Sequence, residues 1–158
     1  MRELRRPSQF AISEGFVLFK SIIGSGLVHA YRETEYRVHG DEPFTLKVGQ
    51  ASPALAAAHK RYGVNCSAYV SSWNPLGEDH EISVNTQRNA ELAAGLAQLS
   101  LASIEGIGQH PTSQRPGEAS YLIFGLTLKA AQALGTRWAQ NAVVWSGDNA
   151  VPQLIMLR

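Results

Sequence analysis

Polar side chains gather where a predicted strand ends and a predicted helix begins. Asn74 follows an apolar run that ends at Trp73, and Asn85, Arg88 and Asn89 open the helix that we predict over residues 85–100. Residues three and four positions apart share one helix face, so Arg88 and Asn89 are expected on the same side as Asn85. A helix N-terminus offers free N–H groups and partial positive charge, which together with a guanidinium suit a phosphate or carboxylate.

Glu118 is the carboxylate that the sequence offers to this cluster. It precedes the apolar run 121–126, and at the same sheet rim it would serve as an acid, a base or the partner of Arg88. We therefore expect a polar rim pocket for a small anionic or nucleotide-like ligand, as a binding site or as an active site. The candidate ligand-binding residues are Asn74, Asn85, Arg88, Asn89, Ser120 and Gln140, and Glu118 is the candidate acid–base group.

Each of these residues also has a structural interpretation. Asn74 with Pro75 is a common turn device, and Asn85 suits a simple helix N-cap. Arg88 and Glu118 could form a structural ion pair, and Gln140 could satisfy buried backbone groups. The alternative function is therefore a non-enzymatic protein–protein interaction module, with the polar cluster structural and residues 16–28 contacting a partner or a second copy.

Apolar periodicity predicts one α+β domain. Phe44, Leu46 and Val48 alternate with polar residues, as in a half-buried strand, whereas Leu92, Leu96 and Leu99 recur at helical spacing. Predicted strands cover 36–48 with a turn at 39–43, 66–73, 101–107, 121–126, 142–145 and 151–157; predicted helices cover 27–35, 52–62, 85–100 and 127–138. The fold class is a single mixed β-sheet of about five to six strands, in the order βαβαββαββ, with helices packed on it.

The composition narrows the classes of function. The chain of 158 residues fits one domain, assigned to 28–158 with a leader at 1–27. The formal charge of +1, from 14 basic and 13 acidic residues, argues against general nucleic-acid binding. A single cysteine, Cys66, precludes an intrachain disulfide and fits a cytoplasmic location.

The basic and apolar start superficially resembles an export signal. Glu14 and Lys20 interrupt the apolar stretch, and no uncharged run approaches the roughly 20 residues that span a membrane. Gly24 and Gly26 lack the third glycine of a dinucleotide site, since His29 stands there. The five histidines form no pair at ligand spacing, so no metal or other cofactor is expected.

A spaced set of short motifs resembles one known family. The set is Ala30-Tyr31-Arg32, Thr34-Glu35-Tyr36, Trp73-Asn74-Pro75, Asn85, Arg88-Asn89, Glu118-Ala119-Ser120 and Gln140-Asn141-Ala142-Val143. It is similar to the bacterial domain-of-unknown-function family DUF3293 over roughly residues 28–157. One departure is Gly117, where the family pattern often places an aromatic residue. The resemblance implies no activity, but it marks the positions on which a site would depend.

Overall fold

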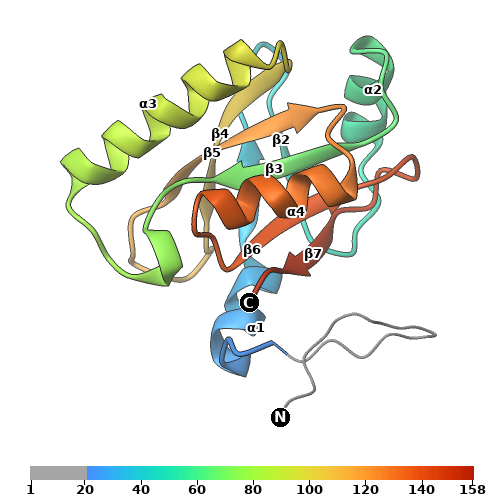
Figure 1. Ribbon diagram of the computed structural model, residues 1–158. Coiled ribbons are helices and arrows are strands. Elements are labelled where there is room, and N and C mark those ends of the chain that lie inside the picture. Colours follow the sequence, from blue (N-terminus) through green and yellow to red (C-terminus); the bar gives the residue numbers. More distant parts are fainter. Residues whose placement is uncertain (1–20) are drawn as a thin grey trace.

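The computed structural model describes residues 21–158, which form four α-helices, a 3₁₀ turn and seven β-strands (Figure 1). In chain order they are α1 (Ser25–Glu33), β1 (Glu35–Val38), β2 (Phe44–Leu46), α2 (Pro53–Arg61), β3 (Ser67–Ser71), η1 (Pro75–Gly77), α3 (Ile82–Gln98), β4 (Ser103–Gln109), β5 (Glu118–Phe124), α4 (Leu128–Arg137), β6 (Ala142–Ser146) and β7 (Gln153–Met156). Residues 1–20, with most of the predicted leader and part of the predicted contact segment 16–28, lie outside the described residues.

The strands form one sheet in the order β2-β1-β4-β5-β3-β6-β7. The α+β class is confirmed, but the strand number and the mixed sheet were wrong. The predicted strand 36–48 is two paired strands, β1 and β2, joined by a turn in which Gly40 takes a φ of 85°. Every pairing within residues 21–158 is antiparallel. The helical connection from β3 to β4 does give two strands of the same direction, but β5 lies between them.

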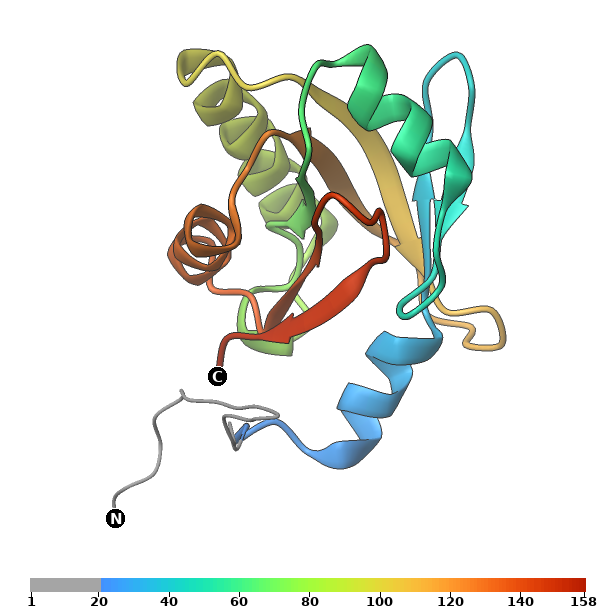
Figure 2. The same ribbon diagram turned by 90° about the vertical axis from the view of Figure 1, so that its right-hand side faces the viewer.

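The two faces of the sheet carry separate cores. Ala68 and Val70 of β3 pack against α3 and α4, through residues such as Leu92 and Leu96. Tyr69 of the same strand points to the opposite face, in the core that contains Leu55 and Ala58 of α2. Figure 2 shows α3 and α4 on one side of the sheet and α2 on the other. Period-two alternation in a strand buried on both faces accounts for this division.

Two of the helix starts follow the capping residues expected from the sequence. The Ser52 hydroxyl accepts the N–H of Leu55 at 3.0 Å, and the Thr127 hydroxyl accepts the N–H of Ala130 at 3.2 Å. Helix α3 begins at Ile82, three residues before the predicted start. Asn85 therefore lies in the first turn of α3 rather than at its N-cap.

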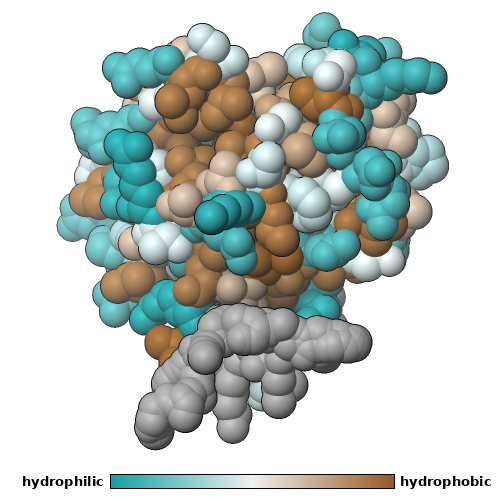
Figure 3. All heavy atoms as spheres, turned by 45° about the vertical axis from the view of Figure 1, so that its right-hand side comes forward, coloured by the Kyte–Doolittle hydropathy of each residue, from teal (hydrophilic) through white to brown (hydrophobic). Residues whose placement is uncertain are grey.

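Apolar side chains also reach the surface. Figure 3 shows brown, hydrophobic residues gathered in places between hydrophilic ones on one face of the molecule. The most exposed large apolar residues are Ile22 and Ile82, each 75% exposed, and they lie before α1 and at the start of α3. Partly apolar surfaces are ordinary in folded proteins. None of the helices in residues 21–158 is both long and apolar enough to cross a membrane.

Gly106 of β4 leaves room for the backbone of β1 and for the Tyr69 side chain, which reaches across from β3. A Cβ atom there would lie 2.0 Å from the Arg37 carbonyl oxygen and 2.7 Å from the Tyr69 hydroxyl. We expect Gly106→Ala to lower the free energy of unfolding by about 1–3 kcal/mol, because the strands must move apart. Urea denaturation measures the change.

The matched control is Gly95→Ala in α3, where nothing lies within 4 Å of the added Cβ. This variant should equal the wild type or gain about 0.5–1 kcal/mol from helix propensity. Equal stability of the two variants would contradict the close packing at Gly106.

Candidate functional site

A cavity of about 440 Å³ lies on the α2 face of the sheet, at the end that carries α1. Leu27, Ala30 and Tyr31 of α1 form one wall, and the other walls come from β1, β3, β5, β6 and the β4–β5 loop. Figure 2 shows α1 at the opposite end of the sheet from α2. The volume is within the range of small-molecule sites, roughly 300–1,000 Å³.

Strand register brings the polar floor of the cavity together. Ser71 of β3 lies opposite Ser120 of β5, and Tyr69 lies opposite Leu122. Because alternate residues of a strand share a face, Glu118 stands on the same face as Ser120, one step nearer the strand end. The two residues differ in burial: Ser120 is buried, and Glu118 is partly exposed.

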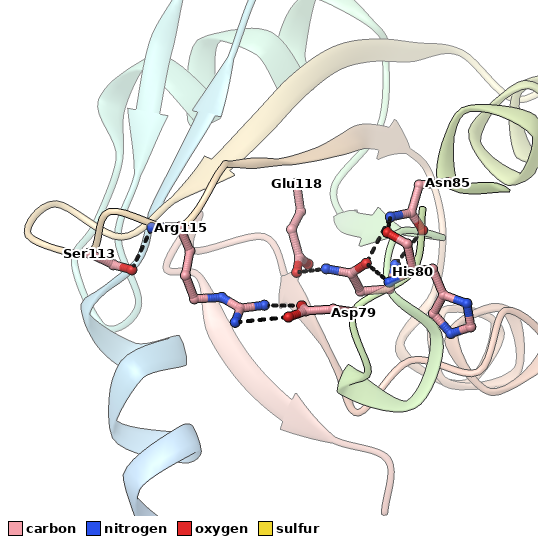
Figure 4. Close-up of polar contacts among 7 residues, drawn as sticks. Asp79, His80, Asn85, Ser113, Arg115 and Glu118 are labelled. Atoms are coloured by element: carbon pink, nitrogen blue, oxygen red, sulfur yellow. Dashed lines mark hydrogen bonds and ion pairs between the residues drawn. The ribbon is translucent and has the colours of Figure 1, made fainter. Parts of the chain in front are cut away.

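Two asparagines connect the end of β3 to α3. The Asn74 N–H donates to Asn85 Oδ1 at 2.8 Å, and Asn85 Nδ2 donates to Asn74 Oδ1 at 2.7 Å. The His80 N–H donates to the same Asn74 oxygen at 3.1 Å. This leaves Asn74 Nδ2 to donate to Glu118 Oε2 at 3.2 Å (Figure 4). Asn74 thus fixes the orientation of the carboxyl group.

The environment of Glu118 raises its pKa above the ordinary glutamate value. Burial is the main cause, because a poorly solvated carboxyl group resists ionisation. The hydrogen bond from Asn74 and the charge of Arg115 lower the pKa, and the charge of Asp79 raises it, but burial prevails. The protonated form of Glu118 is therefore favoured more than that of an exposed glutamate.

An exposed ion pair lies beside Glu118. Arg115 of the β4–β5 loop pairs with Asp79 of the loop before α3, and its NH1 donates to Asp79 Oδ2 at 3.4 Å. The Ser113 hydroxyl accepts the Arg115 N–H at 3.1 Å, which orders the loop (Figure 4). Arg115 is not among the residues predicted from the sequence, because nothing in the spacing of these two loops indicates that they meet.

Three tyrosines also line the cavity. Tyr36 and Tyr69 contact edge-on with ring centroids 5.3 Å apart, and the Tyr36 hydroxyl donates to the Tyr31 carbonyl at 2.6 Å. Burial raises the pKa of all three hydroxyl groups. Asn141 Nδ2 donates to the Tyr31 hydroxyl at 3.0 Å. None of these residues was predicted as a site residue from the sequence, although Tyr31, Tyr36 and Asn141 belong to the short motifs that resemble DUF3293.

The structure brings some of the proposed site residues to the cavity and leaves others outside. Those that line it are Asn74, Glu118, Ser120 and Gln140. Asn85 supports Asn74 from behind. Asn89 Nδ2 lies 3.4 Å from the Tyr121 hydroxyl, in the core on the opposite face. Gln140 Nε2 donates to the carbonyls of Trp73 and Trp138, each at 3.2 Å.

Arg88 bridges backbone carbonyls instead of lining the cavity. Its Nε donates to the Ser72 carbonyl at 2.8 Å and its NH2 to the Trp138 carbonyl at 2.6 Å. The guanidinium also lies 5.3 Å from the centre of the Trp138 ring. Within residues 21–158 no ion pair joins Arg88 to Glu118, because the guanidinium is bound to backbone carbonyls instead.

A match to a known protein family covers part of this site. Residues 70–143 match the model of DUF3293, described as a protein of unknown function. The match confirms the predicted resemblance over the segment that carries Asn74, Asn85 and Glu118. At Gly117, the departure noted in the sequence, a Cβ would lie 2.6 Å from the Ile107 side chain.

The three tyrosines of the cavity lie outside the DUF3293 match. No match to the chain was found among curated proteins or among solved structures. The part of the chain that the structure describes holds no group of three or more His, Cys, Asp or Glu residues that could bind a metal ion.

Replacing Arg88 should affect stability. We expect Arg88→Ala to lower the free energy of unfolding by about 2–4 kcal/mol, because the carbonyls of Ser72 and Trp138 lose charged donors. Thermal and urea denaturation measure the loss, with the exposed Arg137→Ala as the matched control. A variant as stable as Arg137→Ala would contradict the structural role.

Replacing Glu118 should change how stability depends on pH. Because the folded-state pKa is raised, ionisation of Glu118 destabilises the fold. The benefit of the neutral form is complete below the unfolded pKa, about 4.5, and is lost as pH rises through the folded pKa. Relative to wild type, Glu118→Gln should therefore gain stability from pH 4.5 upward. Urea denaturation across pH tests this, with exposed Glu105→Gln as control; a difference independent of pH would contradict it.

Proposed function

We propose that this chain is a small-molecule-binding domain whose ligand sits between α1 and the sheet, with Glu118 as its main polar contact and acid–base group. The observation that carries the proposal is a partly buried, oriented carboxyl group that no cation of residues 21–158 neutralises directly, in a cavity of about 440 Å³. Such a group costs stability, so its place at a cavity is typical of functional sites.

The hydrogen bonds of Glu118 support this assignment. Oε2 accepts the amide of Asn74, whereas within residues 21–158 Oε1 has no protein donor. A carboxyl group with one fixed and one free oxygen can hold a ligand in a defined orientation. With a pKa raised by burial it can also take up or release a proton, so that the same geometry suits binding and general acid–base catalysis.

The geometry alters the ligand expected from the sequence. Arg88, on which an anionic or nucleotide-like ligand mainly depended, donates to backbone carbonyls, and Arg115 is paired with Asp79. Anions are therefore no longer the leading class of ligand, and they form one group of compounds in the binding screen. The single cysteine remains our ground for proposing a cytoplasmic location.

A protein–protein interaction is the second candidate function. Ile22 and Leu27, from the described part of segment 16–28, are 75% and 41% exposed. Exposed apolar side chains in this segment favour a contact with a partner or a second copy. This role does not require Glu118, so the two candidates separate in one experiment.

A thermal-shift screen tests the proposed function. The panel holds nucleotides, phosphorylated metabolites, amino acids, amines and dicarboxylates, each with wild type, Glu118→Gln and Glu105→Gln. A ligand at about 100 times its Kd adds about 2.7 kcal/mol of stability, which should appear in wild type and Glu105→Gln and fall in Glu118→Gln. A shift that Glu118→Gln retains in full would sink the role of Glu118. No shift from any compound would favour the interaction candidate.

A further inference from the structure

The hydrogen-bond donors around the cavity are largely engaged with protein acceptors. Gln140 Nε2 donates to two carbonyls, Asn74 Nδ2 donates to Glu118, and Asn141 Nδ2 donates to Tyr31. The hydroxyls of Tyr36 and Tyr69 donate to backbone carbonyls at 2.6 and 2.7 Å. The cavity wall therefore offers few free donors to a ligand.

The acceptors are distributed differently. Asn74 Oδ1 accepts two hydrogen bonds, and Asn141 Oδ1 accepts Arg158 NH1 at 2.7 Å. Within residues 21–158, however, no protein donor reaches Glu118 Oε1 or Gln140 Oε1, although both residues line the cavity. A surface with free acceptors and engaged donors recognises a ligand that donates hydrogen bonds.

The charges around the cavity favour the same ligand class. Arg115 is paired with Asp79, and His110 Nε2 lies 2.9 Å from Glu33. Glu33 also pairs with His29, and Arg158 donates to Asn141 Oδ1 rather than to a carboxylate. Glu118 has an amide as its polar partner, and its carboxyl group is the acidic group that faces the cavity without an ion pair in the described chain.

Aromatic rings supply the remaining walls. Tyr31, Tyr36 and Tyr69 line the cavity together with apolar residues of α1 and β6. Ring faces attract cations, and the attraction strengthens when water is excluded. An acceptor at one end of an aromatic, partly apolar space matches a molecule with an ammonium group on an apolar body.

We propose that the ligand of this cavity is a small organic amine, bound as its ammonium form with N–H groups donated to Glu118 and Gln140 and its apolar body against the tyrosines. This inference rests on the proposed function and names its ligand class. The hydrogen bond to Glu118 is charge-assisted and the one to Gln140 has a neutral acceptor. The cavity thus selects a ligand by its positive charge and by the number of its N–H donors.

The proposal fixes the sign of a pH dependence. The titratable and charged groups around Glu118 are Arg115, Asp79, Tyr31, Tyr36, Tyr69, His110 with Glu33, and Arg158 through Asn141. Burial favours the protonated carboxyl group, whereas an ammonium ion binds the carboxylate. Affinity should therefore rise with pH until Glu118 is ionised, then stay level to about pH 8, below which an alkylamine remains protonated.

Titration of the ¹⁵N-labelled full chain by NMR tests the ligand class with three probes of one shape. Benzylammonium carries the charge, benzyl alcohol is neutral, and benzoate has the opposite charge. We expect benzylammonium to shift amides of β3 and β5 and to bind at least about tenfold more tightly than benzyl alcohol, with benzoate weakest. Glu118→Gln should lose this preference, and Glu105→Gln should keep it.

Other results separate the two proposals. Equal or tighter binding of benzyl alcohol or benzoate in the cavity overturns the amine assignment and leaves the proposed function standing. No shift of the cavity amides by benzylammonium also overturns it, whereas the proposed function fails only if the wider screen finds no Glu118-dependent ligand. If Glu118→Gln does not fold, the wild type still decides, because affinity for benzylammonium that does not rise with pH contradicts the proposal.

Discussion

The reciprocal hydrogen bonds between Asn74 and Asn85 join the end of β3 to the first turn of α3, and the geometry of the cavity depends on them. Asn85 is 2% exposed, so loss of its partner would leave a buried amide unsatisfied. The chain just after β3 is unusual: Asn74 and Leu76 have φ values of 46° and 59°. A left-handed conformation at leucine is costly and persists only where other contacts impose it. The asparagine pair thus holds a strained turn and aims one amide at Glu118.

The same strand alternation that builds the core also builds the site. Ala68 and Val70 stabilise the sheet against α3 and α4, and the intervening Tyr69, with Ser71 beyond it, faces the cavity side. Helix α1 closes the cavity but has no buried residue of its own. The helices that do carry buried residues are α2, α3 and α4. The cavity and the core on the α2 face share residues, since Tyr36 and Tyr69 belong to both.

The sequence predicts local features better than it predicts contacts between segments that are far apart in the chain. The caps at Ser52 and Thr127 and the strand around Val70 follow from residue type and period, and both are observed. Spacing could also place Asn74 near Asn85. Spacing could not show that Arg88 would bind the carbonyls of Ser72 and Trp138, nor which side of the sheet each polar residue would face. Arg115 and Asp79 lie in two different loops, 36 positions apart in the sequence. Only the folded sheet brings them together.

Burial of Glu118 has two opposite consequences. It disfavours the carboxylate form, and so lowers stability whenever the group is ionised. The same poor solvation strengthens the interaction of that carboxylate with any cation that enters, because less water screens the charge. Arg115, whose charge lowers the pKa of Glu118, is itself paired with Asp79. The fold therefore holds a carboxyl group in an unfavourable environment, which a bound cation would relieve under the proposed function.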